Sequence, residues 1–110
     1  MNIINKYLLE AIKDQEIGLI KDFILKKPDL FHKDENGRTL LFDAVQTGNI
    51  KIVEMLIFSL MGTGMSLQRL ALLEIKDNYG KTAQDQAAEN GFKEIEALLR
   101  SEKVRMTYYE

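Results

Sequence analysis

Residues 34–57 read DENGRTLLFDAVQTGNIKIVEMLI, and residues 77–99 read DNYGKTAQDQAAENGFKEIEALL. Each stretch begins with Asp, has Gly three residues later and Thr two residues after that, and continues through a second Gly to an apolar, Leu-containing end. A shift of the first stretch toward the N-terminus aligns residues 42–45, FDAV, with residues 9–12, LEAI. The chain therefore holds three copies of one unit, and the third copy follows after ten extra residues.

A pair of helices is predicted in each copy. Thr39 and Thr82 stand where a first helix would begin, and their hydroxyls can accept hydrogen bonds from free backbone amides. Gly48 and Gly91 suit the left-handed conformation that ends a helix. Apolar residues then recur at helical spacing and predict a second helix with a buried face, namely Ile50, Val53, Leu56 and Ile57. Such a unit cannot bury its apolar face alone, so neighbouring units must stack.

This pattern resembles the ankyrin repeat, whose motif is Asp-x-x-Gly-x-Thr-Pro-Leu-His-x-Ala-Ala, then Gly-His, then an Ile/Val-Val-x-Leu-Leu segment. Residues 34–57 and 77–100 carry the motif well, and residues 3–33 carry it weakly. The resemblance implies an all-α fold, a short ankyrin-type helix-turn-helix solenoid. We expect a single domain over residues 1–110, with repeats at approximately 1–33, 34–76 and 77–110.

Four positions depart from the family motif. Leu40 and Ala83 stand where the family has Pro, which pre-sets the first helical φ. Phe42 and Asp85 stand where the family has a His that ties adjacent turns together by hydrogen bonds. The resemblance therefore implies a weaker network between turns in this chain.

Two further departures fit end repeats. Gln15 occupies the place of the helix-ending Gly in the first copy. Glu96 stands in the third copy where the second copy has Val53, which suits a terminal repeat with one face in water.

The composition argues against several functional classes. The net charge is −2 with both signs mixed, which does not suit a nucleic-acid partner. The apolar stretch at residues 55–61 is too short to span a membrane. No Cys is present and His32 is the only His, so we expect neither metal nor cofactor. The glycines of residues 62–66 match no phosphate-binding motif, and no nucleophile is paired with a base. We expect a cytoplasmic protein that is not an enzyme.

The ankyrin resemblance implies non-catalytic binding of a partner protein through a concave face and the turn tips. Two alternatives stay open: an inhibitor or antitoxin-like immunity protein that blocks a partner enzyme or toxin, and a subunit that self-associates through the insertion at residues 59–74. The candidate partner-binding residues are Lys33, Glu35, Asn36 and Arg38 in one turn, Lys76, Asn78, Tyr79 and Lys81 in the next, and Lys13, Gln46 and Glu89 on first helices. Tyr79 is the strongest candidate, because an aromatic residue at a turn tip is a common hot-spot type.

The ten extra residues lie within residues 59–74, SLMGTGMSLQRLALLE. Ser66 is expected to cap a short helix whose apolar stripe includes Leu67, Leu70, Ala71 and Leu72 or Leu73. In one interpretation this helix packs on the convex back of the stack. In the other it protrudes, and Met61, Met65 and Leu67 contact a partner as a second surface.

Overall fold

The computed structural model describes residues 2–60 and 66–109, and it describes their side chains except at residues 66 and 105–109. The regular secondary structure of this part of the chain is helical, with no strand, which confirms the all-α prediction. The helices are α1 (Ile3–Lys13), α2 (Ile17–Ile24), α3 (Leu40–Gln46), α4 (Ile50–Phe58), α5 (Ser66–Glu74), α6 (Ala83–Glu89) and α7 (Lys93–Tyr109).

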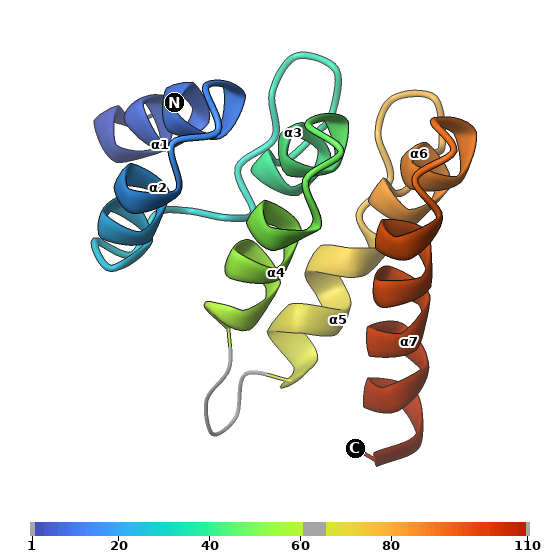
Figure 1. The fold of residues 1–110 in the computed structure, drawn as a ribbon. Coiled ribbons are helices and arrows are strands. Elements are labelled where there is room, and N and C mark those ends of the chain that lie inside the picture. Colours follow the sequence, from blue (N-terminus) through green and yellow to red (C-terminus); the bar gives the residue numbers. More distant parts are fainter. Residues whose placement is uncertain (1, 61–65, 110) are drawn as a thin grey trace.

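The helices form two layers of a short stack (Figure 1). The first layer contains α1, α3 and α6, in that order, and the second contains α2, α4 and α7. Each first-layer helix packs against its own partner in the second layer and against its neighbours in the first. Ala44 and Ala87 are fully buried in α3 and α6, where a small side chain lets adjacent helices approach closely. The apolar core thus runs through the whole stack.

Local sequence explains where most helices begin and end. The Thr82 hydroxyl accepts a hydrogen bond from the Asp85 amide, and the Asp85 carboxylate accepts one from the Thr82 amide, so a capping box begins α6. Gly48 and Gly91 have φ values of +72° and +75°, which confirms their helix-ending role. Gln15 adopts φ +54° at the equivalent place after α1, without the freedom of glycine.

The capping role predicted for Thr39 is wrong. Thr39 is the residue before α3, but its side chain makes no capping hydrogen bond. Its hydroxyl is buried and has no hydrogen-bond partner within residues 2–60 and 66–109. The position lacks the acid that Asp85 supplies three residues after Thr82, since Phe42 stands there and lies in the core.

The ten extra residues contribute α5, which packs against α7 and α6 (Figure 1). Its first residue is Ser66, but the capping role expected of the Ser66 side chain lies outside the described side chains. Leu72 and Leu73 are its buried leucines, whereas Leu67 is 71% exposed, so the buried stripe does not include Leu67. The Glu74 carboxylate lies 3.9 Å from the Lys103 ammonium of α7. The helix therefore packs within the molecule, as the first interpretation expected, while Met61 and Met65 lie outside the described residues.

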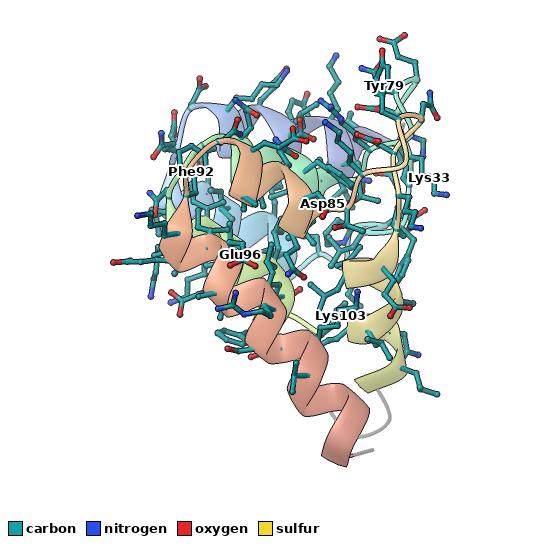
Figure 2. All side chains as sticks on the ribbon, turned by 90° about the vertical axis from the view of Figure 1, so that its right-hand side faces the viewer. Lys33, Tyr79, Asp85, Phe92, Glu96 and Lys103 are labelled. Atoms are coloured by element: carbon teal, nitrogen blue, oxygen red, sulfur yellow. The ribbon has the colours of Figure 1, made fainter. Side chains whose placement is uncertain are left out.

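The two ends of the stack differ in chemistry. Figure 2 looks onto the α6–α7 end, where Glu96 accepts hydrogen bonds from Gln84, at 2.9 Å, and from Arg100, at 2.9 Å. At the opposite end, Ile3 and Tyr7 of α1 are exposed, and the Tyr7 ring stacks on Phe23 of α2 with centroids 6.0 Å apart. The α6–α7 end thus presents hydrogen-bonded polar groups, as expected from Glu96, whereas α1 exposes Ile3 and Tyr7 together with charged residues such as Lys6 and Glu10.

Candidate protein-binding surface

The predicted site residues lie on the turns before α3 and α6 and on the first helix layer. Figure 2 shows Tyr79 at the tip of the second turn, with Lys33 on the same side of the molecule. We call this set of two turns and the neighbouring first-layer side chains the turn surface. Its candidate residues are Lys13, Lys33, Glu35, Asn36, Arg38, Gln46, Lys76, Asn78, Tyr79, Lys81 and Glu89.

An aspartate organises each turn from inside. In the first turn, Asp34 Oδ1 accepts hydrogen bonds from the amides of Asn36 and Arg38, at 2.8 and 3.0 Å. In the second, Asp77 Oδ1 accepts from the amides of Tyr79 and Lys81, at 2.9 and 3.0 Å. The repeated Asp of the motif is therefore a turn-forming residue in both copies.

Hydrogen bonding lowers the pKa of the Asp77 carboxyl. The Lys81 amide has the largest effect, burial opposes it, and the Tyr79 amide and the Arg38 guanidinium lower the pKa further. The Asp77 side chain is only 1% exposed, and Arg38 Nε donates to its second oxygen at 3.1 Å. A buried carboxylate that accepts three hydrogen bonds stays ionised and holds the turn backbone in one conformation.

The two turns are tied to each other through Asn78. Its amide donates to the Asn36 carbonyl at 2.9 Å, and its side-chain amide donates to the Glu35 carbonyl at 2.9 Å. Gly37 lies directly against Asn78 with φ +76°. Asn78, predicted as a contact residue, therefore also has a structural role that the sequence did not reveal.

Arg38 adds a second tie between the turns. Besides its ion pair with Asp77, its guanidinium lies 6.0 Å from the centre of the Phe42 ring. Phe42 occupies the position of the family's His, and its ring is buried. The turns are thus joined by Arg38, Asp77 and Asn78 instead of by the histidine bonds of the family motif.

Tyr79 is the most accessible aromatic side chain for which the structure gives an exposure, at 75%. Its ring projects from a turn whose backbone is held by the bonds of Asp77 and Asn78. An exposed aromatic group on a rigid turn loses little conformational freedom when a partner covers it. This arrangement is typical of an interface anchor.

The predicted first-layer residues are already engaged with neighbours. Gln46 Oε1 accepts from the side-chain amides of Gln86, at 2.6 Å, and Asn90, at 3.3 Å. Lys81 forms an ion pair with Glu89, which raises the pKa of Lys81. Gln46 thus joins two neighbouring repeats, and Lys81 joins the second turn to α6. These contacts hold the turn surface together.

Asp43 of α3 is a charged residue of this surface that sequence reasoning did not select. Burial and, to a smaller extent, the charge of Asp34 together raise the pKa of its carboxyl from 3.8 to about 6, against the opposing effects of Lys13 and Arg38. Its surroundings are assembled from three separate segments, so no local motif could have identified it. The charge of Asp43 therefore depends on pH near neutrality.

The remaining candidates are exposed. The side chains of Lys13, Lys33, Glu35, Asn36 and Lys76 lie in solvent on the turn surface. Leu67 is exposed on α5, which belongs to the side of the molecule where α5 and α7 pack together. The structure therefore brings the turn and first-layer candidates together and leaves Leu67 apart from them.

The described part of the chain contains no group of three or more His, Cys, Asp or Glu side chains that could hold a metal ion. No helix within residues 2–60 and 66–109 is long and apolar enough to cross a membrane. The chemistry that the turn surface does offer is an exposed aromatic ring on a hydrogen-bonded turn, together with exposed lysines, which suits recognition of another macromolecule.

Helix pairs stacked in two layers and joined by hydrogen-bonded turns define a helical-repeat protein. A family model described as ankyrin repeats, in three copies, matches residues 8–108. The chain belongs to the ankyrin repeat family, whose repeats mediate protein–protein interaction. Comparison with curated proteins found none that matches this chain.

One solved structure containing a similar chain is the Bd0816 predatory endopeptidase from Bdellovibrio bacteriovorus in complex with immunity protein Bd3460. The match has a TM-score of 0.70 and 31% sequence identity, and it covers 88% of the present chain. It covers 46% of the matched chain, so this protein spans less than half of that chain's length.

Proposed function

We propose that this protein binds a partner protein through the turn surface and acts without catalysis. The observation that carries the proposal is Tyr79, which is 75% exposed at the tip of a turn fixed by Asp77 and Asn78. Lys33 and Lys76 flank the turns as exposed cations, and Asp43 adds a carboxylate on the first layer. The partner covers the Tyr79 ring and meets these charges at the rim.

The test is affinity capture from an extract of the source organism, followed by calorimetry with the purified partner. Tyr79→Ala should weaken binding by about thirtyfold, since truncating a buried interface tyrosine costs about 2 kcal/mol. Tyr79→Phe should retain most of the affinity if the ring is the main contact.

Leu67→Ala is the matched control, because Leu67 is equally exposed but lies on α5. It should leave the affinity unchanged, and both variants should melt at the temperature of the parent. A partner that binds Tyr79→Ala as tightly as the parent protein would reject the turn surface as the binding site.

A second candidate function is inhibition of a peptidase. It is favoured by the 31% identity to a chain from the complex between an endopeptidase and its immunity protein. In this case the partner captured above is an endopeptidase, and the turn surface obstructs its substrate cleft. Adding the purified protein should reduce peptidase activity in proportion to complex formed, and Tyr79→Ala should shift inhibition to higher concentration. A captured partner with no peptidase activity would leave simple protein binding as the function.

A further inference from the structure

A hollow lies on the second helix layer, between α2 and α4. Its volume is about 440 Å³, and its walls include Ile24 and Leu25 of α2 with Met55 and Phe58 of α4. Leu25 is 74% exposed and Phe58 is 37% exposed, although both are large apolar side chains. We call this hollow the α2–α4 groove.

The α2–α4 groove adjoins another hollow, of about 300 Å³, and Ile24 and Ser59 line both. This adjoining hollow is lined by Phe31, which is also exposed. Three exposed apolar side chains, Leu25, Phe58 and Phe31, therefore line two adjoining hollows. Such a concentration marks a binding surface more often than isolated apolar residues do.

The two charged side chains that line the α2–α4 groove itself are both lysines, whereas the adjoining hollow is lined by Lys27 and Asp29. The two lysines of the groove are Lys21 of α2 and Lys51 of α4, one on each wall. Both are exposed, and neither forms an ion pair with any residue that the structure describes. An apolar floor between two lysines is complementary to an apolar ligand that carries carboxylates along its edges.

The molecule itself shows which kind of element packs in this way. α5 lies against α7, another helix of the second layer, and against α6, and its Leu72 and Leu73 side chains are buried. The carboxylate of Glu74, next to these leucines, faces the ammonium of Lys103 on α7 at 3.9 Å. A short helix with leucines on one face and a glutamate at the edge therefore packs on a lysine-bearing second-layer helix.

We propose that the α2–α4 groove is a docking site for an amphipathic helix of a partner protein, with leucines on its buried face and acidic residues on its flanks. α2 has eight residues and α4 has nine, so each wall is about 12–14 Å long and matches two to three helical turns. The leucines cover Leu25 and Phe58, and the acidic flanks pair with Lys21 and Lys51. This site is separate from the turn surface and does not depend on it.

The probe is a stapled, fluorescein-labelled helical peptide of about 14 residues, because shorter unstapled helices are marginal in water. It carries leucines at i, i+3, i+4 and i+7 and glutamates on both flanks. Fluorescence polarisation should show saturable binding to the full chain, weakened by salt because the flanking charges are screened. Leu25→Asp should reduce the affinity at least tenfold, while circular dichroism shows the same helix content as the parent.

Two comparisons separate docking from non-specific adhesion. The double variant Lys21→Glu with Lys51→Glu should lose affinity for the glutamate peptide and gain affinity for a peptide with lysines in place of the glutamates. Leu67→Asp and Tyr79→Ala should bind the original peptide like the parent, so a failed turn-surface proposal would leave this result intact.

Equal binding of the peptide to the parent and to Leu25→Asp would overturn the proposal. Absence of binding to the parent would overturn it as well. A parent protein that sediments as a dimer, and that Leu25→Asp converts to a monomer, would assign the groove to a second copy and likewise overturn docking of a partner helix.

Discussion

Gly37 shows how closely the two turns approach each other. An added β-carbon would lie 2.5 Å from Asn78 Oδ1 and 3.0 Å from the Asn78 amide nitrogen. Gly80 has nearly the same φ, +77°, but a β-carbon there would meet nothing within 4 Å. Replacing Gly80 therefore measures the conformational cost of losing glycine alone, and replacing Gly37 adds the steric cost at the contact between the turns.

We expect Gly80→Ala to lower the free energy of unfolding by about 1 kcal/mol, the cost of a left-handed conformation for a residue with a β-carbon. Gly37→Ala should lower it by roughly 2–4 kcal/mol, because the clash with Asn78 adds to that cost. Urea denaturation of the two variants measures the difference. Equal losses would mean that the two turns separate easily and that the second turn is not held against the first.

Asp43 predicts a pH dependence at the residue scale. Because burial raises its folded-state pKa to about 6, the proton binds more tightly in the folded chain than in the unfolded one. The stability contributed by the protonated acid is complete below about pH 4 and is lost as pH rises toward 6. Above that range the ionised carboxylate lowers the free energy of unfolding.

Asp43→Asn should therefore be more stable than the parent at pH 7 by about 1 kcal/mol, allowing for partial contact of this side chain with water. The two proteins should converge in stability near pH 3.5. Urea denaturation at several pH values measures the difference, in which the titration of Asp77 and the other acids largely cancels. A difference that stays constant from pH 3.5 to 7 would show that Asp43 does not titrate in this range.

At the scale of the element, α5 shows why an inserted helix stays with the stack. Leu72 and Leu73 face the core, whereas Leu67 points into solvent. Leu72→Ala should lower the free energy of unfolding by about 2–4 kcal/mol, the usual cost of truncating a buried leucine. Leu67→Ala, measured by the same thermal or urea denaturation, should change it by less than about 0.5 kcal/mol. Similar costs for the two would mean that α5 is not docked as described.

At the start of the first helix in each full repeat, the sequence predicted one side-chain capping bond correctly and the other wrongly. Thr82 caps α6 because Asp85 completes a reciprocal pair of bonds three residues later, all within one turn of chain. Thr39 carries the same side chain in the same motif, yet Phe42 stands at the corresponding position and no cap forms. The Phe42 amide donates to the Thr39 carbonyl at 3.0 Å instead of to its hydroxyl, so the motif predicted the residue before the helix but not the bond of its side chain.

The helix order and the repeat period were predictable because each depends on residues close in sequence, such as Gly48 before α4. The contacts between side chains on the turn surface were not predictable in this way, because they join residues from different repeats. Asp43 acquires its surroundings from Lys13 and Arg38, and Asn78 is held by the carbonyls of the preceding repeat. The buried side of α5 also depended on how α7 meets it, so the apolar pattern alone placed Leu67 wrongly.

At the scale of the whole molecule, the middle repeat is the most enclosed. α3 packs between α1 and α6, and α4 packs against α2 and α7. Because stability in a stack is shared between neighbours, a repeat with two neighbours opens less often than one with a single neighbour. We expect the amides of α3 and α4 to exchange with deuterium most slowly and those of α1 to exchange fastest. Hydrogen exchange followed by mass spectrometry resolves the repeats, and slower exchange in α1 than in α4 would contradict this order.

The unlike ends of the stack bear on whether copies of this chain can join head to tail. Open filaments grow when one end of a subunit matches the other end of the next. Here the exposed Ile3 and Tyr7 side chains would meet the ion pair of Glu96 and Arg100, and the Arg100 side chain, which is 59% exposed, would lose its contact with water. The hydration of this ion pair thus opposes linear polymerisation of a fold that is itself built by repetition.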